Sequence, residues 1–400
     1  MHYISRIIED IILESSKTFK VVFLGGPRQV GKTTVLKKLA ENKKFSYVTL
    51  DDLNQRNIAQ KDPALFLQQL PLPIIIDEVQ YAPELFPQIK KMVDQSSKNG
   101  QFWLTGSQQF SLIKNIQESL AGRVAVLNIL GLSLAEKKED RKANKYPFGG
   151  AYKKPKLNDV FKEIFEGGFP IFQSNKAPNR EVYFNSYIQT YLDRDLVGIF
   201  GVNKTSEFNR FIQVCAARTG QVLNISNLAR DSGVSSTTAI EWIGILENTM
   251  QIYLLRPYYP NITNRIIKSP KLYFLDTGLG SYLTKWGSPA VLQAGAMQGA
   301  FFETYVVSEI IKSYIFRAIV PSIYYLRDKE GHEVDLVIED NGLNLVEIKL
   351  SASIKDDFSL GMNYFSRKSD KFISKTIISL VENKISTSNK VNYIPYTIIN

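Results

Sequence analysis

The chain has 400 residues, of which 44% are hydrophobic and 22% charged, and its formal net charge is +10 at pH 7. These values are typical of a soluble globular chain with two or three domains. No stretch of about 18 uninterrupted apolar residues is present, so no transmembrane helix is expected. A single cysteine, Cys215, excludes an intramolecular disulfide, and with only two histidines a Cys/His zinc site is not expected. Any bound metal should therefore be an oxygen-ligated ion such as Mg²⁺.

The amino-terminal segment, Met1 to Ser16, carries isoleucines at helical spacing. Glu9 and Asp10 interrupt what would be the apolar core of a signal peptide, and no small-residue cleavage site follows. We therefore expect an amphipathic helix here, and a cytoplasmic protein that does not act at a membrane. The basic net charge is consistent with a nucleic acid or another polyanion as partner.

A phosphate-binding motif follows this segment. Residues 26–33 fit the pattern G-x-x-x-x-G-K-[ST]. The apolar run Val21 to Leu24 predicts a buried strand before the motif, and Lys32 to Ala40 predicts a helix after it. Lys32 should reach the β- and γ-phosphates of ATP, and the Thr33 hydroxyl should ligate Mg²⁺. The expected ATP-binding residues are Gly26, Pro27, Arg28, Gln29, Val30, Gly31, Lys32, Thr33 and Thr34.

A second acidic motif ends a later strand. Phe45 to Leu50 predicts a strand, and Asp62 to Leu70 predicts a short helix capped by its first residue. In Pro73 to Glu78, three isoleucines precede two acids, which predicts a buried strand with carboxylates at its carboxyl end, where ligands bind in open α/β sheets. Asp77 should hold Mg²⁺, directly or through water. Glu78 should polarise the attacking water, because two adjacent carboxylates cannot cheaply share one role.

Two further residues are candidates for the ATP site. After a predicted helix, Pro83 to Asp94, the strand Gln101 to Ser107 ends in small polar residues. If this strand lies between the acid-bearing and phosphate-binding strands, Ser107 lies beside the γ-phosphate and can orient water or report the nucleotide state. Arg123 leads into a strand at Val124 to Leu127. It is either an ordinary surface arginine or a finger for the nucleotide of a neighbouring subunit, which would require a homo-oligomer.

The next segment is strongly basic. Ala135 to Lys156 holds eight Lys or Arg against three acids, and we expect a solvated linker. Gly167 to Pro170 predicts a turn. Tyr183 to Phe200 predicts a packed, salt-bridged helix, with nucleotide sensing by Arg194 as the alternative.

Leu223 to Asn248 has helix-turn-helix form, with the turn at residues 233–235. Two apolar runs, Ile252 to Leu255 and Leu272 to Leu275, then predict a two-stranded wing, so we expect a winged helix. The second helix, from Ser235 to Asn248, has no Lys or Arg, which favours a structural or phosphate-contacting role over base recognition. The predicted phosphate contacts are Arg256, Arg265, Lys268 and Lys271.

The last third carries a possible nuclease centre. A helix is predicted over Ala300 to Ser313, followed by two strands joined by the hairpin turn at residues 340–342. Asp335 on the first strand and Glu347-x-Lys349 on the second resemble the PD-(D/E)xK nuclease core. Asp335 and Glu347, with Glu303 from the helix, could hold Mg²⁺, and Lys349 could orient the hydrolytic water. The alternative is a nuclease-like domain kept for binding or assembly, in which these charges form salt bridges.

A family resemblance becomes clear from these motifs. The phrases at 26–34, 76–80 and 104–108, followed by Leu-Ala-Gly-Arg at 120–123, resemble the AAA_14/DUF4143 family of AAA-type ATPases. The phrases at 166–170, 187–196, 275–279 and 347–349 are similar as well, so the resemblance covers nearly the whole chain. It implies an α/β protein: a P-loop ATPase with an additional-strand parallel sheet, then a winged helix and a small α/β nuclease-like domain.

We therefore divide the chain into an ATPase domain at 1–134, a basic linker at 135–156, a winged-helix region at 157–283 and a nuclease-like domain at 284–400. The expected function is Mg²⁺-dependent ATP binding and hydrolysis, coupled to nucleic-acid binding or cleavage by the C-terminal domain, with DNA favoured. The alternative is an ATPase switch or scaffold whose inactive nuclease-like domain binds protein or DNA.

Overall fold

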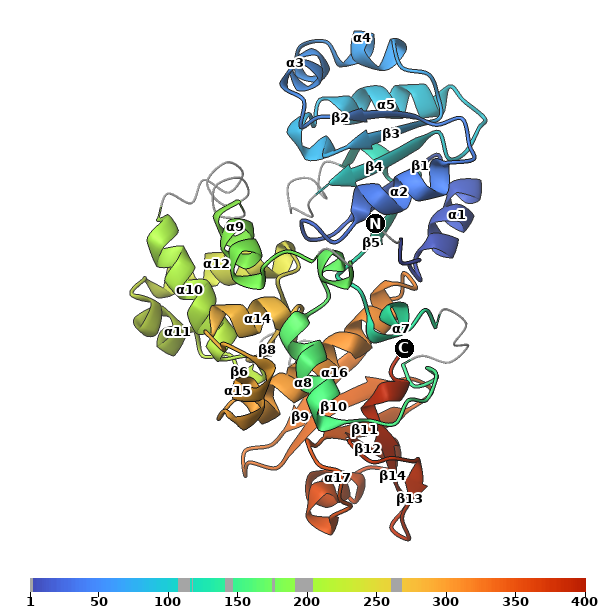
Figure 1. The fold of residues 1–400 in the computed structure, drawn as a ribbon. Helices are drawn as coiled ribbons and strands as arrows, with labels where there is room; N and C mark the ends of the chain where they lie inside the picture. Colours follow the sequence, from blue (N-terminus) through green and yellow to red (C-terminus); the bar gives the residue numbers. More distant parts are fainter. Residues whose placement is uncertain are drawn as a thin grey trace.

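A computed structural model describes residues 3–106, 116, 118–140, 147–174, 177–190, 204–259 and 268–400. A parallel sheet with its helices lies at one end of the molecule, and a second, mixed sheet lies at the other (Figure 1). A largely helical middle region with a small sheet lies between them (Figure 1). This confirms the predicted α/β fold class.

The amino-terminal sheet has five parallel strands in the order β2-β3-β4-β1-β5. Strand β4 therefore lies between β3, which carries the acids, and β1, which precedes the phosphate loop, as predicted. Every residue of β1 and β4 is buried, because helices cover both faces of a parallel sheet. The strands are β1 (Val21–Gly25), β2 (Ser46–Thr49), β3 (Ile74–Asp77), β4 (Phe102–Gly106) and β5 (Val124–Asn128).

The helices of this part follow the predicted order with one addition. Helix α4 begins after Asp62, whose carboxylate accepts a hydrogen bond from the Leu65 backbone N–H, as the cap prediction required. An unpredicted helix, α3, begins after Asp52, which caps it in the same way. The helices are α1 (Glu9–Thr18), α2 (Lys32–Ala40), α3 (Leu53–Lys61), α4 (Pro63–Gln68) and α5 (Leu85–Asp94).

The middle region contains the predicted helix-turn-helix as α11 and α12, joined through Gly233 in a left-handed conformation. The predicted two-stranded wing is instead a three-stranded antiparallel sheet in the order β6-β8-β7. Arg194 and Arg265 lie outside the described residues. The elements are α8 (Leu157–Glu166), α9 (Arg180–Thr190), α10 (Thr205–Ala217), β6 (Gln221–Val222), α11 (Ile225–Ser232), α12 (Ser236–Asn248), β7 (Ile252–Leu255), β8 (Lys271–Phe274), α14 (Thr277–Leu283) and α15 (Pro289–Ala294).

The start of the basic segment is not a solvated linker, contrary to the prediction. It forms α7 (Leu134–Lys137), which Ser133 and Glu136 close with a capping box. Lys137 Nζ donates to the carbonyl oxygen of Gly167 at 2.5 Å, and Lys138 Nζ donates to that of Thr397 at 2.9 Å. Burial lowers the pKa of both lysines. Long lysine stems can reach buried carbonyls, which is why a charge count alone misjudged this segment.

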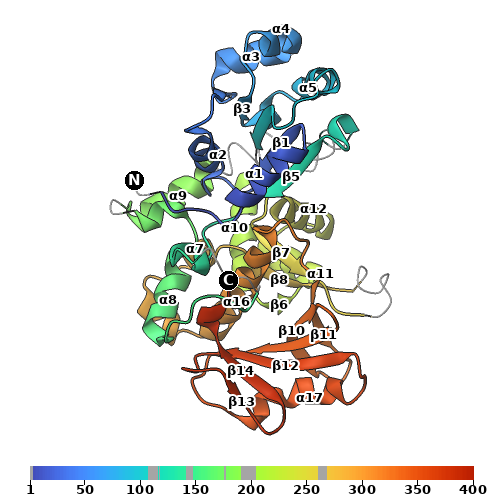
Figure 2. The same ribbon diagram turned by 90° about the vertical axis from the view of Figure 1, so that its right-hand side faces the viewer.

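The C-terminal part is a six-stranded mixed sheet in the order β13-β14-β12-β11-β10-β9. Figure 2 shows α16 and α17 on opposite sides of this sheet. The first of these helices is buried along most of its length. No helix in the described part of the chain has the length and apolar character needed to cross a bilayer. The elements are α16 (Gln298–Ile315), β9 (Ile323–Arg327), β10 (Glu333–Glu339), β11 (Leu343–Ile348), α17 (Leu360–Ser366), β12 (Phe372–Ser379), β13 (Ile385–Ser386) and β14 (Val391–Pro395).

One hydrophobic cluster crosses all three parts. It includes Val35 of α2, Ile164 of α8, Val306 of α16 and Val346 of β11. Because the apolar packing is continuous, it does not separate the chain into domains. The predicted domain boundaries therefore stay predictions.

Candidate ATP site and C-terminal acidic centre

The phosphate loop connects β1 to α2 in a conformation that requires glycine. Gly26 has φ +147°, and a Cβ atom there would lie 2.0 Å from the carbonyl oxygen of Ile129. Gly31 has φ +95° and forms the left-handed turn into α2. Lys32 is buried, and its Nζ donates to the carbonyl oxygens of Gly26 at 3.0 Å and Pro27 at 2.8 Å. The loop therefore holds the ammonium group inside its own concavity.

The buried carboxylate of Asp77 is the centre of a group of hydroxyls at the carboxyl end of β3. Its Oδ1 atom accepts from Thr33 Oγ1 at 2.7 Å and also from Thr105 Oγ1. Its Oδ2 atom accepts from the Tyr47 hydroxyl at 3.1 Å. Burial and the Asp77 charge raise the pKa of Tyr47 to about 12, so this phenol remains a donor at neutral pH. Residues of three neighbouring strands, β2, β3 and β4, thus meet at the Asp77 carboxylate.

The residues at this point fit Mg²⁺. The Thr33 hydroxyl and the Asp77 carboxylate are hard oxygen donors in direct contact, next to the loop that carries Lys32. The structure therefore brings together Lys32, Thr33 and Asp77, as the sequence analysis expected. Tyr47 and Thr105 were missed. Thr105 could have been noticed as a polar residue inside an otherwise apolar strand, whereas Tyr47 gave no signal.

Glu78 leaves the strand by a sharp turn. Its backbone is left-handed, with φ 57° and ψ 46°, which costs a residue other than glycine about 1 kcal/mol or more. Its N–H donates to Thr105 Oγ1 at 3.2 Å, and its carboxylate accepts from Gln80 Nε2. Two adjacent acids thus have different partners, as two different roles require. The catalytic role of Glu78 stays a prediction.

Ser107 lies outside the described residues. Arg123 lies at the amino-terminal edge of the sheet, since its carbonyl oxygen accepts from the N–H of Val21 at the start of β1. The phosphate loop follows the opposite end of that strand, so Arg123 does not reach the ATP site of its own chain. Its Nη2 atom donates to Asp94 Oδ2 at 3.1 Å. A role in a neighbouring subunit stays a prediction.

A buried arginine that the sequence analysis missed supports the loop. Arg6 Nη1 donates to the carbonyl oxygen of Val30 at 2.9 Å, and Nη2 donates to that of Leu130 at 2.7 Å. Its Nε atom lies 3.0 Å from Glu136 Oε1, and both side chains are almost fully buried. Arg6 therefore ties the amino-terminal segment to the phosphate loop and to the chain that leaves β5. One arginine among the isoleucines of this segment was the available signal.

A small cavity of about 140 Å³ lies beside the loop. Residues from the amino-terminal segment, α2 and the chain after β5 line it: Tyr3, Ile4, Arg6, Val30, Gly31, Thr34, Val35, Leu132 and Pro170. The cavity therefore lies next to the phosphate loop, at the start of α2.

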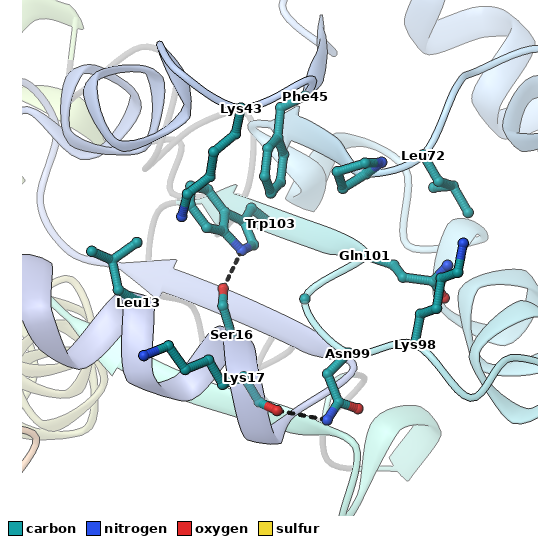
Figure 3. Close-up of a pocket in the computed structure, with 12 residues that line it drawn as sticks. Leu13, Ser16, Lys17, Lys43, Phe45, Leu72, Lys98, Asn99, Gln101 and Trp103 are labelled. Carbon is teal, nitrogen blue, oxygen red and sulfur yellow. Dashed lines mark hydrogen bonds between the residues drawn. The ribbon is translucent and has the colours of Figure 1, made fainter.

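The larger cleft shown in Figure 3, of about 480 Å³, is a different place. Phe45 and Gln101, which line it, precede strands β2 and β4. The cleft therefore lies at the amino ends of the strands, whereas the phosphate loop and Asp77 lie at their carboxyl ends. Its walls are held together by hydrogen bonds, such as that from Trp103 Nε1 to Ser16 Oγ at 2.6 Å (Figure 3). It is not the ATP site.

The predicted nuclease residues do come together. Lys349 Nζ lies 2.8 Å from Glu347 Oε2 and 3.5 Å from Asp335 Oδ2, which also accepts from the Ile348 N–H at 2.9 Å. Burial and the neighbouring Asp335 raise the pKa of Glu347 well above its usual range. Burial alone would raise the pKa of Asp335, but the ammonium groups of Lys349 and Lys271 hold it below its usual range.

Lys271 is buried here, so its predicted role as a phosphate contact is wrong. Its Nζ atom lies 2.5 Å from Glu333 Oε1, 3.3 Å from Glu303 Oε1 and 3.9 Å from Asp335 Oδ1. Glu303 Oε1 also accepts from the Tyr273 hydroxyl at 2.6 Å. The contributions of Tyr273 and Glu333 to this centre were not predicted from the sequence.

A divalent metal does not fit this arrangement. Two of the carboxylates expected to hold it, those of Glu303 and Asp335, already lie within 4 Å of the Lys271 ammonium group. The third, that of Glu347, lies 2.8 Å from the ammonium group of Lys349. A metal ion would therefore add two positive charges next to two lysines. We derive no cleavage step from this centre.

Comparisons with known proteins agree with the geometry of the ATP site. Residues 18–137 match the AAA domain family AAA_14. Residues 157–290 match DUF8612 and residues 298–399 match DUF4143, both domains of unknown function. Two uncharacterized proteins, Rv2008c of Mycobacterium tuberculosis and Mb2031c of Mycobacterium bovis, are each 29% identical over 324 residues, which cover 80% of this chain and 68% of theirs.

Solved structures show weaker similarity. The Walker-type ATPase PABY2304 of Pyrococcus abyssi is 15% identical, and the match covers 70% of this chain and 96% of that one, with a TM-score of 0.45. The Holliday junction branch migration motor RuvB of Thermotoga maritima is 16% identical, with 62% and 88% covered and a TM-score of 0.31. By these matches, the amino-terminal part of the chain is similar to the AAA domain family AAA_14, and the carboxyl-terminal part is similar to DUF4143.

Proposed function

We propose that this protein binds ATP and hydrolyses it with Mg²⁺. The observation that carries the proposal is the Asp77 carboxylate at the end of β3, which accepts the hydroxyls of Thr33, Thr105 and Tyr47. This arrangement lies at the carboxyl edge of a parallel sheet beside a phosphate loop, which is where nucleotides bind in open α/β folds.

The side chains have separate tasks in the proposed reaction. The loop N–H groups and Lys32 bind the phosphates, and Lys32 exchanges its two carbonyl partners for phosphate oxygens. Thr33 and Asp77 would hold Mg²⁺, which neutralises charge on the phosphates when it is bound. Glu78 accepts a hydrogen bond from the attacking water and draws its proton away, while Gln80 orients the carboxylate. Positioning and charge stabilisation supply most of the rate.

The test is the substitution Glu78→Gln, which removes the charge and keeps the shape. The hydrolysis rate should fall by about 100-fold or more, because a positioned general base typically contributes 10²–10⁴. ATP binding, measured with a fluorescent ATP analogue, should stay close to that of the unchanged protein. Glu84→Gln, at an exposed acid a short distance along the chain, is the matched control and should leave both quantities unchanged. Continued turnover by Glu78→Gln would refute the role of Glu78.

We further propose that ATP controls the binding of a nucleic acid, with DNA favoured. The formal charge of +10 supports a polyanionic partner. The absence of Lys and Arg from α12 favours a structural or phosphate-contacting role of that helix over recognition of bases. The test measures binding and ATPase stimulation with duplex DNA, single-stranded DNA and RNA over a salt series. The logarithm of the association constant should fall linearly with the logarithm of the salt concentration. If none of the three binds at low salt, a protein partner becomes the better proposal.

A homo-oligomer is proposed on the position of Arg123, which lies away from the ATP site of its own chain. In a mixture of Arg123→Ala and Lys32→Ala chains, the first still has an intact phosphate loop and the second still supplies Arg123. Mixing two inactive variants should therefore restore part of the activity. If Arg123→Ala alone is fully active, Arg123 is an ordinary surface arginine.

A further inference from the structure

We propose that the ammonium group of Lys271 is the built-in cation of the C-terminal acidic centre. While it is in place, the centre takes no divalent metal and instead joins the middle region to the C-terminal domain by ion pairs. This inference goes beyond the ATPase function and does not depend on it.

The amine comes from one part of the molecule and its carboxylates come from another. Lys271 lies on β8 of the middle sheet, whereas Glu303 lies on α16 and Glu333 and Asp335 lie on β10. All three carboxylates lie within 4 Å of the Lys271 Nζ atom, and the Lys271 side chain is 4% exposed. An amine is a compact point charge, so it can occupy the middle of a carboxylate group as a small ion does.

The middle region positions this amine through its backbone. Lys271 pairs with Leu255 of β7 and with Val222 of β6, so neighbouring strands hold its main chain on both sides. Tyr273 is two residues further along β8, and period-two alternation puts both side chains on one face. Tyr273 donates its hydroxyl to Glu303 at 2.6 Å. Two adjacent side chains of one face of β8 therefore reach into the centre, which indicates a specific junction.

The charges of the centre nearly balance without any added ion. Among the described residues, three cations form ion pairs with the carboxylates of the centre: Lys271, Lys349 and Arg327. The Nη1 atom of Arg327 lies 3.4 Å from Glu333 Oε2. The carboxylates that they face are Glu303, Glu333, Asp335 and Glu347. A divalent ion would repel two nearby ammonium groups in a poorly solvated place, where charge interactions are weakly screened. Removal of one ammonium group would leave unpaired buried carboxylates, which attract a cation.

The experiment titrates the nucleotide-free full-length chain with Mn²⁺, followed by calorimetry and by the loss of the free-ion EPR signal. The unchanged protein should show no site that depends on Asp335. Lys271→Met keeps the length of the side chain and removes its charge, and it should create a Mn²⁺ site with affinity at least about tenfold higher. The double variant Lys271→Met/Asp335→Asn should lose that site again. Lys268→Met, at an exposed lysine three residues earlier, is the matched control and should bind Mn²⁺ as the unchanged protein does.

Three results would overturn the proposal. The first is a Mn²⁺ site in the unchanged protein that Asp335→Asn removes. The second is Mg²⁺-dependent cleavage of labelled DNA or RNA that Lys349→Ala abolishes. The third is a folded Lys271→Met protein with no new Mn²⁺ site, because the amine would then not be what excludes the metal. If Lys271→Met does not fold, the proposal is tested by comparing the Mn²⁺ titrations of the unchanged protein and of Asp335→Asn. The ATPase rate of each variant reports separately on whether the ATP site is intact.

Discussion

The ATP site and the C-terminal acidic centre each contain an almost fully buried lysine, Lys32 and Lys271, but the two lysines have different partners. Lys32 donates to the neutral carbonyl oxygens of Gly26 and Pro27, whereas Lys271 and Lys349 contact carboxylates. An ammonium group bound to carbonyls can move to an incoming phosphate, since it leaves only polar groups that water or the loop can satisfy. An ammonium group bound to buried carboxylates cannot leave without stranding charge. The first site is therefore built to receive an anion, and the second is already neutralised.

The largest loss of stability should follow from breaking the ion pair between Arg6 and Glu136, beside the ATP site. Arg6→Ala leaves Glu136 buried without its 3.0 Å partner, and breaking such a pair costs about 3–5 kcal/mol of unfolding free energy. Urea unfolding measures this loss. The double variant Arg6→Ala/Glu136→Gln should recover part of it, because the uncompensated charge is removed as well. If Arg6→Ala is as stable as the unchanged protein, the buried ion pair between Arg6 and Glu136 does not stabilise the fold.

The difference between Arg6 and Lys32 also shows what the sequence could predict. The phosphate motif is local: its glycines, Lys32 and Thr33 are contiguous, and the strand and helix around them are fixed by the same residues. Arg6 and Tyr47 reach the site only through the tertiary fold, so no spacing rule indicates them. Thr105 is intermediate, because its strand was predicted but not the side that its hydroxyl faces.

The same limit explains the outcome for Lys271. The strand was predicted at Leu272 to Leu275, one residue later than β8, and Lys271 was placed just before it. Whether this lysine is exposed depends on α16 and β10, which pack against it from much later in the chain. Helix α4 was predicted because Asp62 and Pro63 form a recognisable start. Helix α3 was missed because its face is mostly polar, and Leu53 and Ile58 are exposed on it, so it carries no apolar stripe.

A second test addresses Lys32, the lysine of the phosphate loop. Lys32→Met should reduce ATP hydrolysis by about 100- to 1000-fold, the range found when one charge-stabilising donor is removed, and should weaken ATP binding. Unfolding free energy without nucleotide should change little, because the lysine gives up hydrogen bonds to the backbone carbonyls of Gly26 and Pro27. Lys38→Met, at an exposed lysine of the same helix, is the control for both measurements. If Lys32→Met destabilises the nucleotide-free protein as much as Arg6→Ala does, the proposed contrast between the two kinds of lysine is wrong.

The smallest effect should appear in mild acid at the C-terminal centre. Burial and the charge of Asp335 raise the pKa of Glu303 from 4.5 to about 6, although Lys271 and Tyr273 oppose the shift. Between these two values the folded chain binds more protons than the unfolded chain, so stability should decrease as pH rises from about 4.5 to 6. The contribution of this group is at most about 2 kcal/mol. Glu303→Gln should flatten that part of the curve of unfolding free energy against pH, whereas Glu84→Gln, at an exposed acid, should not. If Glu303→Gln leaves the curve of unfolding free energy against pH unchanged, the pKa of Glu303 is not raised in the folded chain. The ion pair with Lys271 would then offset the effect of burial.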